Sequence, residues 1–183
     1  KLSSSTPVKV DIRQVETHEL IANEHLLSQV FSTLVKAHYQ TTPSDLKLLL
    51  NHQGIKLFVA FYQLQVVAVA LTMVEGQAQQ DDINGVIHST RRLKDQFLPQ
   101  SLFVHANVQN AFDYSYLRVM RIAVTEECQR QGVGQQVLAY VQCFAKSQGY
   151  DFLGTSFGAT KELLDFWRGS QYRLIRLGFT KDK

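Results

Sequence analysis

The chain contains stretches whose apolar residues recur at every second position and stretches where they recur at every third or fourth. Alternation over residues 8–15 predicts a first strand. Residues 17–39 then carry an apolar stripe at helical spacing, which predicts one long helix. The members of the stripe are Leu20, Leu27, Phe31, Leu34 and His38. Pro43 opens a second, shorter helix through Leu50, because proline suits the first helical position.

The middle of the chain is predicted to form a hairpin followed by an insertion. Residues 55–62 and 66–74 are rich in apolar and β-branched residues, and the short connection between them suits a hairpin. Residues 77–110 are more polar, with helical patches and an interruption at Pro99. We interpret this segment as an insertion within a single domain over residues 1–183.

Strands and helices alternate in the last third of the chain. The predicted elements are a strand at 117–124, a helix from 133 that Gly149 ends, a strand at 152–155, a helix at 161–167 and a final strand at 172–177. The order βααββ, insertion, βαβαβ predicts an α/β fold with a mixed sheet and helices on both faces. Apolar residues occur at both parities in the strand 117–124, so either both its faces are buried or a bulge shifts its register.

Composition excludes several classes of protein. With 183 residues, of which 45% are hydrophobic and 19% charged, the chain suits one globular domain rather than a disordered one. No stretch approaches the roughly 20 apolar residues that cross a bilayer, so no membrane span is expected. Cys128 and Cys143 lack the spacing of a metal site or a disulfide framework, which favours a reducing cytoplasm and no metal. The start, Lys1-Leu2-Ser3, indicates a fragment of a longer protein.

The most informative motif lies between the strand 117–124 and the helix that follows it. Its sequence is Gln129-Arg130-Gln131-Gly132-Val133-Gly134. The glycines let the backbone approach a ligand, and the N–H groups of a first helical turn favour an anion. The loop lacks the Gly-Lys-Ser/Thr of a Walker motif, and Val137 stands where a Rossmann fingerprint has its third glycine. The segment resembles the acyl-CoA pyrophosphate loop of the GCN5-related N-acetyltransferase (GNAT) family.

Further segments narrow this resemblance to the acetyltransferase domain of the tRNA(Met) cytidine acetyltransferases. They lie at residues 37–46, 97–102, 121–124, 156–163, 166–167 and 173–178. The resemblance implies a GNAT fold and transfer of an acetyl group from acetyl-CoA to the N4 amine of a tRNA wobble cytidine, which gives N4-acetylcytidine. It also implies an upstream helicase-like ATPase module, absent from this chain, through which alone the protein would use ATP.

The resemblance assigns roles to residues that would bind the cofactor. The backbone of Ile122, Ala123 and Val124 is expected to pair with the pantetheine amides. The residues expected to hold the pyrophosphate are Gln129, Arg130, Gln131, Gly132, Val133, Gly134 and Gln135. Glu162 is expected beside the cofactor. The family has a basic residue at position 169 and a glycine at 171, whereas this chain has Gly169 and Gln171, and we expect Arg168 to supply the charge instead.

The acceptor chemistry makes modest demands on catalytic groups. A cytosine amine is neutral at pH 7, so no base has to deprotonate it before attack. A backbone N–H near Val124 is the candidate oxyanion donor. His38 is a candidate base, or orients the flipped nucleotide together with Tyr39, although it is also in phase with the apolar stripe. Many acetyltransferases place a tyrosine acid where this chain has Phe166-Trp167, so we assign no acid.

Cationic residues of the insertion are candidates for RNA contacts. Arg91, Arg92 and Lys94 would suit tRNA phosphates, with an ordinary solvated helix face as the alternative. His88 and His105 are weaker candidates for function. Two other functions stay open: an acetyltransferase for an amine on a protein or small molecule, and a non-catalytic acyl-CoA or RNA-binding module.

Overall fold

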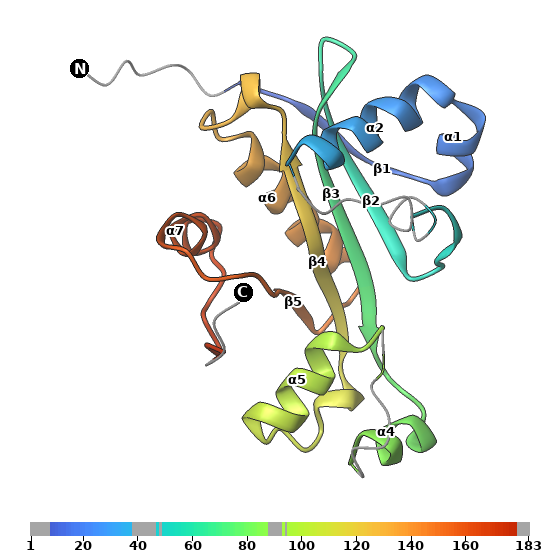
Figure 1. Ribbon diagram of the computed structural model, residues 1–183, viewed down its shortest axis with the longest axis vertical. Helices are drawn as coiled ribbons and strands as arrows, with labels where there is room; N and C mark the ends of the chain where they lie inside the picture. The colour runs from blue at the N-terminus through green and yellow to red at the C-terminus, as the bar shows by residue number, and fades with distance from the viewer. Residues whose placement is uncertain (1–7, 38–46, 48, 88–92, 94, 179–183) are drawn as a thin grey trace. The chain divides into compact units, whose positions relative to one another are not determined.

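A computed structural model of the chain describes residues 8–37, 47, 49–87, 93 and 95–178. A five-stranded sheet with the order β1-β2-β3-β4-β5 runs through it (Figure 1). The chain divides into two compact units. The first comprises Lys1–Thr72 and Met120–Cys143, and the second comprises Met73–Val119 and Phe144–Lys183. We describe each unit in turn.

The first unit begins with β1 (Asp11–Val15), α1 (Thr17–Ala22) and α2 (Glu24–Ala37). The prediction of one helix from residue 17 was wrong, because the chain leaves helical conformation at Asn23, where φ is −133°. The Asn23 side chain then accepts a hydrogen bond from the N–H of Leu26 at 3.0 Å. Asparagine is a strong N-cap residue, so it ends α1 and starts α2.

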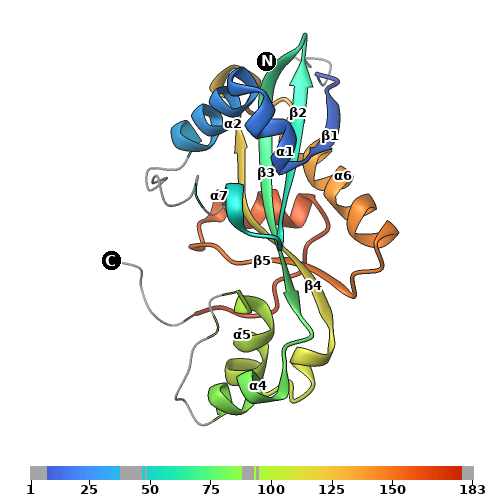
Figure 2. The ribbon, with the colours of Figure 1, turned by 90° about the vertical axis from the view of Figure 1, so that its right-hand side faces the viewer.

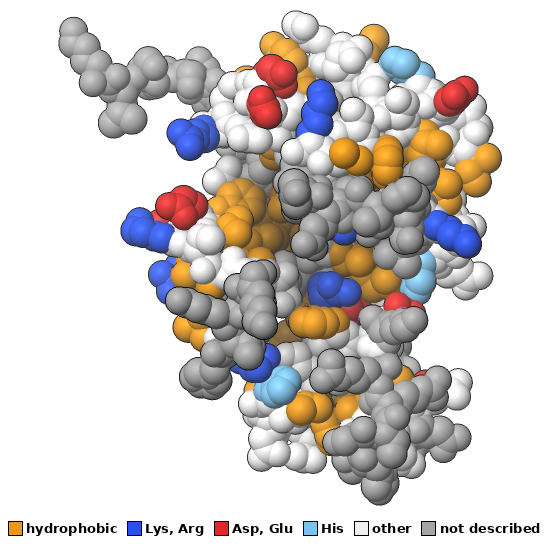
Figure 3. Space-filling model, viewed as in Figure 1, with side chains coloured by type: hydrophobic (Ala, Val, Ile, Leu, Met, Phe, Trp, Pro, Cys, Tyr) orange, Lys and Arg blue, Asp and Glu red, His pale blue; other side chains and the backbone are white. Residues whose placement is uncertain are grey.

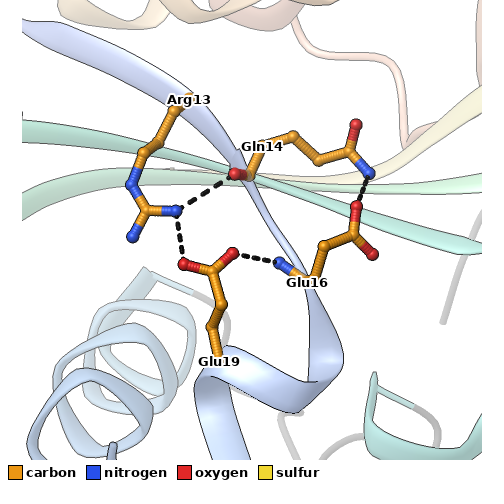
Figure 4. A network of polar contacts seen from close by, with 4 residues as sticks. All are labelled: Arg13, Gln14, Glu16 and Glu19. Carbon is orange, nitrogen blue, oxygen red and sulfur yellow. Dashed lines mark hydrogen bonds and ion pairs between the residues drawn. The ribbon is translucent and has the colours of Figure 1, made fainter.

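The junction between β1 and α1 is fixed by a small polar network (Figure 4). Arg13 Nη1 donates to Glu19 Oε2 at 2.7 Å, and the Glu16 N–H donates to Glu19 Oε1 at 2.9 Å. The backbone N–H of Glu16 and the Arg13 guanidinium together hold the pKa of Glu19 below its ordinary value. The Glu19 carboxylate therefore caps the first turn of α1 while it is ionised.

A tight hairpin joins β2 (Ile55–Tyr62) to β3 (Gln65–Gly76), as predicted. The two residues between them, Gln63 and Leu64, have positive φ angles of 48° and 67°. Two successive positive φ values define the type I′ turn, whose twist matches that of antiparallel strands. On its other side β2 pairs with β1 in antiparallel register, with Arg13 opposite Val59.

Helices cover both faces of the sheet in the first unit, as predicted. Leu57 and Val59 of β2 belong to a core cluster that also contains Leu20, Leu26, Val30 and Leu34 from α1 and α2. Phe58 lies on the opposite face of β2, where its ring packs edge-on against Tyr140 of α6 (Val133–Ser147) at 6.0 Å. Residues 47 and 49–51 are helical, within the short helix predicted before β2.

The second unit contains the parallel pair β4 (Ser115–Val124) and β5 (Phe152–Thr155), in a register that runs from Tyr116 opposite Phe152 to Val119 opposite Thr155. The helix α6 is the crossover between these two strands, as parallel pairing requires. The Tyr116 hydroxyl donates to the Ala111 carbonyl at 2.7 Å, and burial raises the pKa of Tyr116 to about 12. The hydroxyl therefore keeps its proton.

The predicted insertion, residues 77–110, contains α4 (Gln80–Ile87) and α5 (Phe97–Ala106), and the 3-10 turn η1 (Ala111–Asp113) follows it. In both views α4 and α5 lie side by side (Figures 1 and 2). An interruption was predicted at Pro99, and this prediction was wrong. Pro99 is the third residue of α5. A proline is tolerated there because the N–H groups of a first turn have no partner within the helix.

A buried ion pair fastens α5 to the strands of the second unit. Glu75 of β3 has a fully buried side chain, and its Oε1 accepts from Arg118 Nε of β4 at 2.6 Å. Its Oε2 accepts from the N–H of Leu98 at 2.7 Å. The side chain of Gln96 also bonds both the N–H and the carbonyl of Gly76. The start of α5 is therefore held to the end of β3.

The predicted final strand at residues 172–177 is absent. After α7 (Lys161–Gly169) the chain turns back, and the Tyr172 N–H donates to the Trp167 carbonyl at 3.0 Å. The Tyr172 ring packs edge-on against Trp167 at 4.8 Å, and residues 172–178 form an irregular segment. A strand needs a partner for its backbone groups. Within the described ranges, no strand pairs with this segment.

Candidate functional site

The connection between β4 and α6, in the first unit, has the conformation that the motif predicted. The Thr125 N–H donates to the Val67 carbonyl of β3 at 2.9 Å, which anchors the loop where β4 ends. A single 3-10 turn, η2 (Glu126–Cys128), follows. Arg130 and Gly132 then have positive φ angles of 58° and 77°, and α6 begins at Val133. The side chain of Val133 is buried, so the start of the helix is fixed in the core.

Backbone N–H groups at this turn are left for a ligand. The first helical N–H that bonds within the chain here is that of Gln136, which donates to the Gly132 carbonyl at 3.1 Å. The N–H groups of residues 130–135 have no acceptor among the residues that the structure describes. Together with the positive end of the α6 dipole, these groups favour a bound anion such as a phosphate.

The side chains of Gln129 and Gln131 donate hydrogen bonds to backbone carbonyls of the same connection. Gln129 Nε2 donates to the Val124 carbonyl at 3.1 Å, and Gln131 Nε2 donates to the Glu127 carbonyl at 2.6 Å. A ligand would therefore meet the backbone of this loop rather than these amides. The side chains of Arg130 and Gln135 are exposed, so they remain available to a ligand.

The last residues of β4 extend beyond β5, its parallel neighbour in the sheet. The β5 ladder ends with Thr155 opposite Val119, whereas β4 continues to Val124. Ala123 is buried, and Ile122 and Val124 are half-buried. Buried residues of β4 occur at both parities, since Tyr116 is as buried as Leu117. Further along the strand, however, Met120, Ile122 and Val124 are half-buried, so this face is covered only in part.

The structure describes no histidine beside Cys128. Its side chain is buried and lines a hollow of about 510 Å³ next to the loop. The other lining residues are Val8, Tyr62, Gln63, Gln65, Val66, Val67, Thr125, Glu127 and Gln131. A thiol becomes a nucleophile when a partner such as histidine activates it, and none of the described residues that line this hollow is a histidine. Cys143, in contrast, is exposed, and both thiols are free.

The remaining predicted residues fall outside this loop. Glu162 and Arg168 are exposed on α7, in the second unit, so their part in a cofactor site stays a prediction. Two candidate groups lie outside the described residues. These are His38 and Tyr39, predicted for catalysis, and His88, Arg91, Arg92 and Lys94 of the insertion. His105 is described and is exposed near the end of α5.

Three residues with structural importance escaped the sequence analysis. Gln136 of α6 donates from Nε2 to the Val8 carbonyl at 2.7 Å and accepts from the Val10 N–H at 3.4 Å. It thus fixes the chain before β1, and nothing local in the sequence indicates so distant a partner. Glu75 and Arg118 form the buried ion pair. The sequence does contain a sign that this pair is buried, because each of the two is a charged residue next to a run of apolar strand residues.

Two further properties of the described residues bear on the site. No helix among them has both the length and the apolar character to span a membrane. No group of three or more histidine, cysteine, aspartate or glutamate side chains among them is placed to hold a metal ion.

Comparison with known proteins identifies the family. The sequence model of GNAT acetyltransferase 2 matches residues 29–150, which contain β2, β3, β4, the loop and α6. The chain belongs to this family. The strand, loop and helix over residues 115–147 lie within the matched range.

Curated relatives of this GNAT chain are longer proteins. The tRNA(Met) cytidine acetyltransferase TmcA of Nitrosococcus halophilus is 36% identical over 176 residues, which are 96% of this chain and 24% of the relative. TmcA of Vibrio cholerae serotype O1 is 37% identical over 165 residues, 90% of this chain and 23% of the relative. The chain therefore spans about a quarter of the length of these proteins.

Solved structures share the GNAT fold at low identity. A ribosomal-protein-alanine N-acetyltransferase from Brucella melitensis biovar Abortus 2308 superposes with a TM-score of 0.60 and 10% identity, covering 96% of this chain and 99% of that one. The aminoglycoside N-acetyltransferase AAC(6')-Iy, in complex with CoA, superposes with a TM-score of 0.56 and 13% identity, covering 96% and 95%. At this identity the likeness establishes the fold alone.

Proposed function

We propose that this chain is the acetyltransferase domain of an enzyme that transfers an acetyl group from acetyl-CoA to the N4 amine of a tRNA wobble cytidine. The observation that carries the proposal is the loop before α6, whose N–H groups at residues 130–135 have no acceptor among the described residues. The identity of 36–37% with tRNA(Met) cytidine acetyltransferases over nearly the whole chain supports the acceptor.

The loop and the end of β4 fit the two halves of the cofactor. Acetyl-CoA would supply an activated acetyl thioester, and the N–H groups of residues 130–135 would hold its pyrophosphate. The strand residues Ile122, Ala123 and Val124 would pair with the amides of its pantetheine arm. They continue β4 beyond its ladder with β5, which ends at Val119. Glu162 and Arg168 complete the proposed set of cofactor residues.

The residues of this chain would then favour direct transfer. Such a transfer would form a bond between the cytidine N4 and the acetyl carbonyl carbon, break the C–S bond to release the CoA thiolate, and pass the N4 proton to a base. A backbone N–H near Val124 would stabilise the oxyanion, and loss of one such donor costs roughly 3 kcal/mol in other enzymes. His38 and Tyr39 are proposed to receive the proton or orient the base. A covalent route through Cys128 is disfavoured, because no histidine lines its hollow.

We extend the proposal to the longer protein in which this chain would be one domain. An upstream helicase-like ATPase module would use ATP to present the tRNA, and Arg91, Arg92 and Lys94 would contact its phosphates. A tRNA substrate places the reaction in the cytoplasm.

The cofactor half of the proposal is tested by titrating the chain with acetyl-CoA in a calorimeter. We expect binding by the wild type and its loss in Gly132→Glu, because a carboxylate would occupy the anion site and repel the pyrophosphate. Gly149→Glu is the matched control, since Gly149 also has a positive φ, of 76°, but follows the other end of α6, about 25 Å away along the helix. Equal binding by both variants would contradict the assigned loop.

The acceptor half is tested by incubating the chain with acetyl-CoA and tRNA and analysing the nucleosides by mass spectrometry. We expect N4-acetylcytidine, which Gly132→Glu abolishes. Acetylation of a peptide or polyamine in place of cytidine would show an amine acetyltransferase. Cofactor binding without turnover, even with an upstream ATPase module, would show a non-catalytic module.

A further inference from the structure

An exposed aromatic ring at the start of α5 is held by a chain of contacts that ends at a buried charge. Phe97 is the first residue of α5, and 45% of its surface is exposed. The guanidinium carbon of Arg118 lies 5.2 Å from the centre of its ring. Arg118 is in turn fixed by the buried Glu75, and Glu75 accepts from the N–H of Leu98, the residue after Phe97. The position of the Phe97 ring is therefore fixed by Arg118 on its face and by the hydrogen bond of the next residue, Leu98, to Glu75.

This arrangement is unusual for a residue that only fills a core. A buried ion pair is costly to desolvate, and well-packed apolar residues of similar volume often serve stability equally well. Here the pair fixes an aromatic side chain that still exposes much of its surface. A rigid, exposed ring loses little entropy when a flat ligand stacks on it.

Polar side chains and one arginine lie along α5 beyond the ring. Ser101 lies one helical turn after Phe97 on the same side of the helix, and its Oγ accepts from Arg176 Nη1 at 3.3 Å. His105 is a further turn along and is exposed. Apolar, cationic and histidine side chains lie together over α5 on the face that Figure 3 shows.

Arg118 retains donors beyond its ion pair. Only Nε takes part in the contact with Glu75, and its terminal nitrogens have no acceptor among the described residues. Its side chain is 14% exposed. Because Arg118 is largely buried between Glu75 and the ring of Phe97, it is less accessible to a phosphate than an exposed arginine. The exposed Arg176 is the group that suits a phosphate.

We propose that Phe97 is a stacking platform for an unpaired base of the substrate RNA. Arg118 acts as a positioning residue that holds the ring, and Arg176 contacts the backbone phosphate of the same segment. Aromatic rings flanked by arginine are the usual means of binding single-stranded RNA. The proposal rests on the RNA substrate proposed above and adds the surface that receives it.

The test measures the binding of a fluorescein-labelled RNA hairpin with an unpaired, cytidine-containing loop to the 183-residue chain by fluorescence anisotropy. We expect Phe97→Ala to weaken binding on the order of tenfold, the usual loss for one stacked base. Phe97→Trp should bind like the wild type, whereas Phe97→Leu, which keeps apolar bulk without a π face, should behave like alanine. Leu64→Ala, at a residue 90% exposed in the first unit, is the control that should change nothing.

Two more variants separate the roles of the arginines. Arg176→Gln should weaken binding and lower the salt slope by about one, because one phosphate contact is lost. Glu75→Gln combined with Arg118→Gln removes both charges at once. This pair should weaken binding in the wild-type background but add little to Phe97→Ala, since Arg118 acts through the ring. Melting temperatures of all variants check that each is folded.

Different binding results would contradict the Phe97 platform and the proposed acetyltransferase function. Binding by Phe97→Ala or Phe97→Leu equal to that of the wild type, or no binding by the wild type, would overturn the platform. Loss of acetyl-CoA binding in Phe97→Ala would assign the ring to the cofactor's adenine and overturn it as well. If the wild type binds RNA but not acetyl-CoA, the proposed acetyltransferase function fails while the platform stands.

Discussion

Gly132 and Gly76 both have a positive φ, of 77° and 96°, but the chain needs them for different reasons. Gly132 forms the turn that leads into α6, where the proposed pyrophosphate site lies. At Gly76 a Cβ atom would lie 1.8 Å from the Tyr114 carbonyl oxygen, so the position has no space for a side chain. The motif identified Gly132, whereas the partner of Gly76 lies far along the chain and has no local signal.

Gly76→Ala should destabilise the protein by more than about 2 kcal/mol, because it adds a backbone clash to the left-handed conformation, which by itself costs an alanine roughly 1–2 kcal/mol. Gly149→Ala is the matched control, since it has a φ of 76° and no heavy atom within 4 Å of its added Cβ. It should cost only the conformational part. Urea unfolding of both variants gives the comparison, and equal losses would contradict the clash.

Among the elements, the ion pair of Glu75 and Arg118 connects three that are distant in sequence: β3, β4 and α5. Periodicity predicted β2 and β5 with their observed bounds and β3 and β4 nearly so, because alternation records which face is buried. It missed the break at Asn23, where a side-chain cap competes with the helix. It also placed a strand at 172–177, where alternation is present but a pairing partner among the described residues is not.

Glu75→Leu should destabilise the chain by about 3–5 kcal/mol, because it leaves the largely buried Arg118 without its counter-charge. The double variant Glu75→Leu with Arg118→Met should recover most of this loss, since it removes both charges and keeps apolar volume. Urea unfolding followed by far-UV circular dichroism measures both. A double variant as unstable as Glu75→Leu would mean that the hydrogen bond to the Leu98 N–H matters more than the charge.

At the scale of the whole molecule, the two units share three continuous elements: β3, β4 and α6 each run from one unit into the other. A strand or helix cannot end at the boundary without losing backbone hydrogen bonds on both sides. We therefore expect the two units to unfold together.

Thermal unfolding should accordingly be a single cooperative transition. Trp167 is the only tryptophan of the chain and lies buried in the second unit, so its fluorescence reports on that unit. Circular dichroism reports on helices of both units. The two melting curves should coincide, and a tryptophan transition at a lower temperature than the circular dichroism transition would show that the second unit unfolds alone.

The order of most elements and the resemblance to the GNAT family follow from local patterns in the chain. Periodicity reports which residues of a strand or helix are buried. The conformation of residues 129–134 can be predicted from their sequence, because the glycines, the turn and the start of the helix are local features. Only the tertiary structure decided which groups meet. The pairing of Glu75 with Arg118, of Gln136 with Val8 and Val10, and of Phe97 with Arg118 joins residues far apart in sequence. No local pattern encodes such contacts, because they exist only once the strands have packed.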